Sequence, residues 1–140
     1  MKVLVIDDVP MNVVLVRATI GTFCSIFLSA SRGTEGIEIA LEQQPDLIFL
    51  DLGLPDIDGL EVARILSSRP QTSHIPLIAL TARANEESKL EAIASGCTHF
   101  MAKPLDVMKL REMVSHYKKF GALPPHYLPE SAGSVTGDLG

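Results

Sequence analysis

The chain has 140 residues, of which 46% are hydrophobic, and this length and composition suit one ordinary domain with a sizeable core. Its 17 acidic residues outnumber the 12 basic ones, so the formal net charge is −5, and no basic block or aromatic-basic stripe is present. This balance argues against a nucleic-acid-binding surface on this segment.

The N-terminal segment differs from a secretory signal. Lys2 is followed at once by four apolar residues and then by Asp7, so the apolar stretch is too short. No apolar run approaches the roughly 20 residues that a membrane-spanning helix requires. We therefore expect a cytoplasmic protein without a membrane partner.

Three continuous apolar runs have the length of buried strands: residues 3–6, 47–50 and 77–80. Unbroken apolar strands are typical of a parallel sheet that is covered on both faces. Residues 25–29 and 99–102 are predicted to form two shorter strands, which brings the sheet to five.

Segments with helical spacing of apolar residues alternate with these strands, and Thr34 is a candidate cap for the second helix. The positions expected to face the core, helix by helix, are Met11, Val14, Leu15 and Ala18; Ile37, Ala40 and Leu41; Val62, Ala63 and Leu66; Leu90, Ile93 and Ala94; and Leu110, Val114 and Tyr117. Strict strand–helix alternation predicts an α/β fold with a doubly wound five-stranded parallel sheet.

The composition changes after Phe120. Residues 121–140 contain four glycines, three prolines and two serines, and their apolar residues follow no period. We therefore interpret residues 1–120 as the folded domain and residues 121–140 as a disordered tail or linker.

Polar and charged residues follow four of the predicted strands. In strand order they are Asp7 and Asp8, Asp51, Thr81, and Lys103. Because the carboxyl ends of parallel strands share one edge of the sheet, we expect these side chains to converge. Crowded carboxylates repel one another unless a cation joins them, and Mg²⁺ is the cation that prefers such oxygen ligands. A hydroxyl and an ammonium beside this cation would suit a phosphoryl group.

Five segments, at residues 3–8, 46–59, 75–82, 94–97 and 100–104, resemble the receiver domain of two-component response regulators, the CheY-like superfamily. Each segment alone is weakly specific, but five in order with the right spacing are highly specific. The resemblance extends over about the whole predicted domain. It implies a (βα)5, flavodoxin-like architecture with strand order 2-1-3-4-5.

The resemblance implies a metal site. Asp51 would be the phosphoacceptor, and Asp8 and Asp51 would bind Mg²⁺ directly. Asp7 would hold the metal mainly through water, and the backbone carbonyl of Gly53 would complete the protein ligands.

The resemblance also implies a switch. Thr81 would move its hydroxyl towards a phosphoryl oxygen, Phe100 would be the aromatic switch residue, and Lys103 would pair with the phosphoryl group. Simple core filling is the alternative for Phe100. The Lys103–Pro104 bond would ordinarily be trans, and the resemblance favours cis.

Several further residues are open to interpretation. Asp56 and Asp58 are interpreted as turn formers. Asn12 is similar to an Asn of receivers in hybrid kinases and single-domain cell-cycle regulators, and a local hydrogen bond is the alternative. Gly53 lacks a side chain and Arg83 is a large cation at positions that vary among receivers, so both are expected to affect the lifetime of the phosphorylated state.

The expected function is that of a phosphorylation-switched module rather than an enzyme acting on other molecules. The partners would be a histidine kinase or histidine phosphotransfer protein, and a target bound by the face of the fourth helix, fifth strand and fifth helix. Alternatively, the chain is the N-terminal regulatory fragment of a longer regulator or enzyme. A flavodoxin or a Mg²⁺ phosphohydrolase is disfavoured, because neither an FMN phosphate loop nor an Asp-x-Asp-Gly-Thr motif is present.

Overall fold

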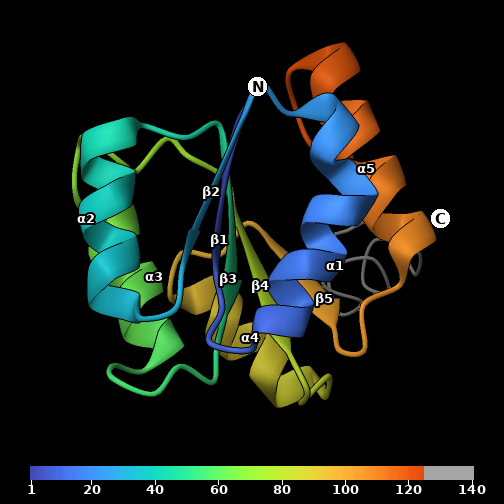
Figure 1. The fold of residues 1–140 in the computed structure, drawn as a ribbon. Helices are drawn as coiled ribbons and strands as arrows, with labels where there is room; N and C mark the ends of the chain where they lie inside the picture. The colour runs from blue at the N-terminus through green and yellow to red at the C-terminus, as the bar shows by residue number, and fades with distance from the viewer. Residues whose placement is uncertain (125–140) are drawn as a thin grey trace, which may run out of the picture.

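The computed structural model describes residues 1–124 and has a central sheet between two layers of helices (Figure 1). The strands are β1 (Lys2–Ile6), β2 (Ile26–Ala30), β3 (Leu47–Asp51), β4 (Leu77–Thr81) and β5 (His99–Ala102). The helices are α1 (Pro10–Ile20), the short 3₁₀ helix η1 (Gly21–Phe23), α2 (Gly33–Gln43), α3 (Gly59–Ser68), α4 (Glu86–Ala94) and α5 (Val107–Phe120). All neighbouring strands pair in parallel, in the order β2-β1-β3-β4-β5. The predicted fold class and strand order are confirmed.

Each face of the sheet has its own apolar core. Leu4 and Ile6 of β1 pack with α2, α3 and α4, whereas Val3 and Val5 pack with α1 and α5. This alternation is the strand period of two, and it lets one apolar run serve both layers seen in Figure 1. None of the helices within residues 1–124 combines the length and apolar character needed to cross a bilayer.

The predicted core faces are confirmed for α2, α3 and α5 but wrong for α1 and α4. In α1 the buried residues are Val16 and Ile20, whereas Met11 and Val14 are 71% and 56% exposed. In α4, Leu90 is 53% exposed. Residues 10–20 are apolar on nearly every side, so their spacing does not determine which side is buried.

The N-terminus of α2 is capped by a residue from a distant loop. Asp56, in the β3–α3 loop, accepts hydrogen bonds from the backbone N–H groups of Gly33 (2.8 Å) and Thr34 (3.1 Å) and from the Thr34 hydroxyl (2.9 Å). The N-cap position itself is Arg32, whose side chain makes no cap bond. The prediction that Thr34 caps this helix is therefore wrong, and Asp56 has a role beyond its own turn.

The described chain continues past α5 and packs on the domain. Within residues 121–124, Leu123 packs against the α1–α5 core and Pro124 is buried. A ring nitrogen of His99, at the start of β5, donates to the Pro124 carbonyl over 3.2 Å. These four residues were assigned to the tail from the sequence, and the rest of that tail, residues 125–140, lies outside the described residues.

Candidate functional site

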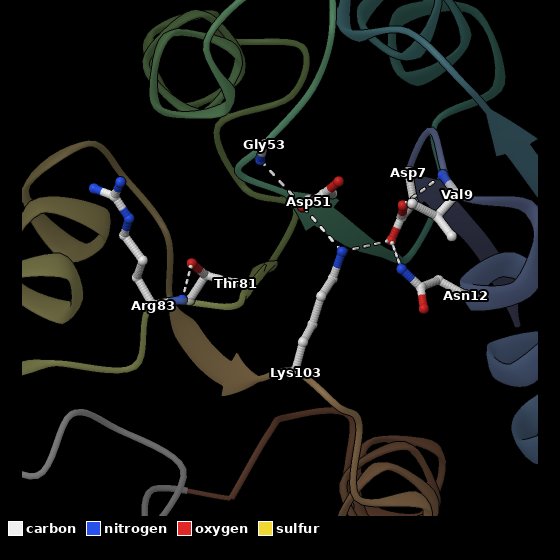
Figure 2. A network of polar contacts seen from close by, with 8 residues as sticks. All are labelled: Asp7, Val9, Asn12, Asp51, Gly53, Thr81, Arg83 and Lys103. Carbon is white, nitrogen blue, oxygen red and sulfur yellow. Dashed lines mark hydrogen bonds and ion pairs between the residues drawn. The ribbon is translucent and has the colours of Figure 1, made fainter.

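The carboxyl edge of the sheet brings the predicted polar residues together (Figure 2). They are Asp7 and Asp8 directly after β1, Asp51 at the end of β3, Thr81 at the end of β4, and Lys103 directly after β5. The pairing register explains this, because Asp51 lies opposite Leu80 and Thr81 lies opposite Ala102, so neighbouring strands end nearly level. Parallel strands of similar length thus deliver all five side chains to one place.

Lys103 bridges two of the carboxylates. Its Nζ atom lies 3.2 Å from Oδ2 of Asp7 and 3.1 Å from Oδ1 of Asp51. Both carboxylate side chains are less than a tenth exposed, so the ion pairs are screened less than surface pairs would be. The Lys103–Pro104 bond is cis, as the resemblance implied. One ammonium thus serves two buried anions, and net negative charge remains.

The Asp7 carboxylate is held by the loop and helix that follow β1. The backbone N–H of Val9 donates to Oδ1 (2.9 Å), and the side-chain amide of Asn12 donates to Oδ2 (3.1 Å). Burial nevertheless raises the pKa of Asp7, and the negative charge of Asp51 raises it further, against the lowering effects of Val9 and Lys103. The ionised form of Asp7 is therefore destabilised by its surroundings in the absence of a further cation.

Asp51 has one occupied oxygen and one available oxygen. Oδ1 forms the ion pair with Lys103 and accepts a hydrogen bond from the backbone N–H of Gly53 over 3.1 Å. Oδ2 makes no hydrogen bond within residues 1–124, and it is not among the fully buried side-chain atoms that lack a partner. This oxygen is consequently accessible from the cleft in front of the strand ends.

Asp8 completes a group of acids that could hold a metal ion. One carboxylate oxygen from each of Asp7, Asp8 and Asp51 lies within 4.8 Å of the others. Asp8 is exposed, whereas Asp7 and Asp51 are buried. Three hard oxygen ligands at this spacing suit a small divalent cation such as Mg²⁺.

A cleft of about 620 Å³ opens in front of these groups and extends to α3 and α4. Its lining includes Thr81, whose Oγ1 accepts a hydrogen bond from the backbone N–H of Arg83 over 3.0 Å. The Thr81 hydroxyl proton therefore remains available to a ligand. Arg83 is also among the lining residues, and Figure 2 shows its side chain directed away from Asp51.

Phe100 is the one predicted site residue that lies apart from the polar network. Its side chain is half-buried and packs against the core on the α2, α3 and α4 face of the sheet. The Val9 N–H group was not anticipated, and Asn12 was noted only as a candidate. The short connection between β1 and α1 could have indicated both groups. It places the first turn of α1 close to Asp7, so the Val9 N–H and the Asn12 side chain can reach its carboxylate.

Comparison with known sequences points to one family. The family description "Response regulator receiver domain" matches residues 3–115. The polar-differentiation response regulator DivK of Brucella anthropi is 32% identical over 116 residues, which are 83% of this chain and 94% of DivK. Response regulator PleD of Caulobacter vibrioides is 32% identical over 119 residues, which are 85% of this chain and 26% of PleD. The chain thus spans nearly all of one relative and about a quarter of the other.

Solved structures share the fold. Chemotaxis response regulator CheY4 of Vibrio cholerae superposes with a TM-score of 0.76 at 26% identity, over 82% of this chain and 96% of CheY4. The receiver domain of sensor histidine kinase PA1611 from Pseudomonas aeruginosa, solved with magnesium in its active-site cleft, gives a TM-score of 0.75 at 24% identity. That superposition covers 84% of this chain and 97% of the PA1611 domain.

Proposed function

This chain belongs to the response regulator receiver family, and on that premise we propose that it is a phosphorylation-switched signalling module with Asp51 as phosphoacceptor. The observation that carries the proposal is the state of the Asp51 carboxylate. Lys103 and the Gly53 N–H hold one oxygen, and the other oxygen has no hydrogen-bond partner among residues 1–124. A nucleophile oriented in this way is ready for attack on a phosphorus atom that enters the cleft.

The phosphoryl donor would be a phosphohistidine of a histidine kinase or histidine phosphotransfer protein. Oδ2 of Asp51 forms the new oxygen–phosphorus bond while the nitrogen–phosphorus bond of the donor breaks. The imidazole leaves with the electron pair of that bond. Lys103 can follow the phosphoryl oxygens from its place beside Asp51 and neutralise part of their charge.

The residues present fit Mg²⁺ as the cation of this reaction. Of the three clustered carboxylates, two pair with the Lys103 ammonium, and the oxygens of all three are close enough to repel strongly without a further cation. Asp8, Asp51 and the backbone carbonyl of Gly53 would hold the ion directly, and Asp7 would hold it mainly through water. Bound Mg²⁺ would neutralise charge on the transferring oxygens. The magnesium-containing cleft of the PA1611 receiver domain supports this assignment by analogy.

Thr81 and Phe100 would convert phosphorylation into a change of surface. The Thr81 hydroxyl accepts a bond from Arg83 and can donate its own proton to a phosphoryl oxygen. The half-buried ring of Phe100 would then turn inward, which changes the face made by α4, β5 and α5 where a target protein would bind. Thr81→Ala should accept phosphate without the shift of Phe100 resonances in NMR spectra. A normal Phe100 shift in that variant would contradict the coupling.

Two organisations of the whole protein are compatible with this role. DivK, matched over 94% of its length, supports a regulator that consists of the receiver alone. PleD, matched over 26% of its length, supports a receiver at the regulatory end of a longer protein. The receiver chemistry proposed for Asp51 is the same in both cases, and we place it in the cytoplasm.

The test is phosphoryl uptake from a labelled histidine kinase or from acetyl phosphate. Asp51→Asn keeps the shape of the side chain but removes the nucleophile, and uptake should be lost. Asp58→Asn is the matched control, because Asp58 lines the same cleft and caps α3, a task that Asn performs equally well. Wild-type uptake by Asp51→Asn would refute the assignment.

A further inference from the structure

The two oxygens of Asp7 are held by a single turn of the chain. The Val9 N–H binds Oδ1 and the Asn12 amide binds Oδ2, from the loop and the first turn of α1 (Figure 2). Pro10 is the first residue of α1, and the Asn12 N–H already bonds the Val9 carbonyl over 3.0 Å. The helix start therefore fixes where the Asn12 side chain lies, and this side chain restrains rotation of the carboxylate.

The number of acceptor positions limits what Asp7 can offer to a cation. An ionised carboxylate has about four lone-pair positions. Val9 and Asn12 occupy one each, and Lys103 adds a third donor at 3.2 Å from Oδ2. Asp8 accepts no hydrogen bond on its side chain from any residue of the described part of the chain, and it is exposed. The neighbouring residues Asp7 and Asp8 thus differ in how many oxygen lone pairs they can offer to a cation.

We propose that Asn12 is a positioning residue of the cation site, which restrains Asp7 so that Asp8 and Asp51 supply the direct carboxylate ligands. The proposal rests on the cation site described under the proposed function and deepens it. Asn12 suits this task because its amide donates a hydrogen bond without adding charge. A Lys or Arg at this position would compete with the cation, and an Asp or Glu would repel Asp7.

The consequence of this restraint is ion selectivity. Mg²⁺ requires nearly ideal octahedral geometry with few ligands, whereas Ca²⁺ accepts six to eight oxygens in flexible arrangements. Removing the Asn12 amide frees one oxygen lone pair of Asp7 and lets the carboxylate rotate. The extra ligand favours Ca²⁺, and the loss of fixed geometry disfavours Mg²⁺. Both effects lower the preference for Mg²⁺ over Ca²⁺.

The first experiment measures this preference. Calorimetric titrations with Mg²⁺ and with Ca²⁺ give the ratio of the two affinities for the wild type and for Asn12→Leu, which keeps the size of the side chain but lacks its donor. We expect the ratio to fall about tenfold, the scale of effect that second-sphere groups have on metal affinity. Met11→Ala is the matched control, because Met11 is the preceding residue of α1 and is 71% exposed. Its ratio should equal that of the wild type.

A double-mutant cycle tests whether Asn12 acts through Asp7. In an Asp7→Asn background, Asn12→Leu should change the affinity ratio by less than about twofold, because the group that Asn12 restrains is gone. A full tenfold effect in that background would overturn the proposal, since Asn12 would then act by another route. An unchanged ratio in the single variant, or an equal fall in Met11→Ala, would overturn it as well.

A spectroscopic readout separates positioning from general stability. The side-chain NH₂ signals of Asn12 should shift in Asp7→Asn and persist when Mg²⁺ saturates the wild type, because the restraint is needed in the loaded site. If the Asn12 NH₂ signals did not shift in Asp7→Asn, the hydrogen bond from Asn12 to Asp7 would be refuted. If the wild type bound no Mg²⁺ at all, the cation role in the proposed function would fail first. If the wild type bound Mg²⁺ and Asn12→Leu matched it, this inference alone would fail.

Discussion

Asp7 and Asp56 each have three donor groups within hydrogen-bond or ion-pair distance, yet their pKa values move in opposite directions. Asp56 accepts three at the start of α2, and although desolvation acts to raise its pKa, these bonds lower it to about 2. Asp7 also has three donors, one of them the Lys103 ammonium, but burial and the charge of Asp51 raise its pKa. Donor count alone therefore does not decide which form of a carboxyl group is favoured.

The difference separates a structural acid from a functional one. At the start of α2, the exposed carboxylate of Asp56 accepts hydrogen bonds from helix N–H groups that have no partner within the helix. This arrangement needs no further ligand. The pocket at the carboxyl edge brings three acids to one ammonium and leaves them short of positive charge. Such local strain is typical of a site that awaits a ligand.

The largest expected effect concerns the ligand itself. Mg²⁺ at a hundred times its dissociation constant should stabilise the wild type by about 2.7 kcal/mol, because it binds only the folded state. Asp8→Asn should lose most of this gain, whereas Asp56→Asn should keep it. Thermal unfolding with Mg²⁺ and with a chelator measures both. An equal gain in Asp8→Asn and the wild type would remove the distinction between the two acids.

Removing the structural acid should lower stability without any ligand. Asp56→Ala leaves the N–H groups of Gly33 and Thr34 without their protein acceptor, so its melting temperature should fall by several degrees. Since the folded pKa of Asp56 is depressed, the deficit should be full above pH 3.8 and should shrink as the pH falls towards 2. Arg83→Ala is the control at neutral pH. A deficit that stayed constant down to pH 2 would contradict the ionic cap.

These two acids also show what could be read from the sequence. Asp7, Asp8, Asp51 and Lys103 were predicted to converge, because each follows an apolar run and parallel strands end at one edge. The role of Asp56 was not predictable, since its partners lie more than twenty residues away and only the folded chain brings the β3–α3 loop to the start of α2. Short-range patterns thus located the functional acids and missed the structural one.

The helix faces teach the same lesson. The amphipathic sequences of α2, α3 and α5 predicted their buried sides, but α1 has apolar residues on most of its surface, and its packing against α5 selects Val16 and Ile20. The edge strand β2 begins one residue later than predicted, and its burial along residues 26–30 does not alternate, so its pattern did not define its bounds. Tertiary contacts supply what an ambiguous pattern lacks.

Neutralising the strained acid should stabilise the metal-free protein. Asp7→Asn removes a buried charge beside Asp51 and keeps an acceptor for the Val9 N–H, so its melting temperature at pH 7 should exceed that of the wild type. The folded pKa of Asp7 is raised, so the wild type loses stability as the pH rises from 3.8 through the folded pKa. The advantage of the variant should therefore vanish below pH 3.8. Lower stability of Asp7→Asn at pH 7 would show that Lys103 fully compensates Asp7.

The contacts of residues 121–124 with the domain, like those of Asp56 with α2, need no ligand, and truncation of the chain tests how much stability they contribute. Ending the chain after Phe120 removes Leu123 and the Pro124 carbonyl that His99 binds, which should cost about 1 kcal/mol, the scale of partly burying one apolar side chain. Ending it after Pro124 should cost nothing and should leave phosphorylation intact. Equal melting temperatures for both truncations would show that residues 121–124 contribute no stability.

The smallest expected effect lies at the rim of the strained pocket, where Gly53 and Arg83 flank the approach to Asp51. Hydrolysis of an aspartyl phosphate needs a water in line with the phosphorus–oxygen bond. A side chain at Gly53 would enter open space, since its Cβ would meet only Oδ1 of Asp51, at 3.8 Å. Gly53→Asn therefore fits, and its amide could orient that water.

Arg83 acts on the same step from the other side. Arg83 is one of the residues that line the cleft, and on rotation towards Asp51 its five donors can cover the phosphoryl oxygens once phosphate is present. We therefore expect slow self-dephosphorylation, which both Gly53→Asn and Arg83→Ala should accelerate about threefold, a barrier change below 1 kcal/mol. The measurement is loss of label from purified phosphoprotein in excess Mg²⁺ after donor removal, with Met11→Ala as control. If both variants lost label as slowly as the wild type, Gly53 and Arg83 would have no influence on the rate of dephosphorylation. The lifetime of the phosphoryl group would then depend on the buried acids and Lys103.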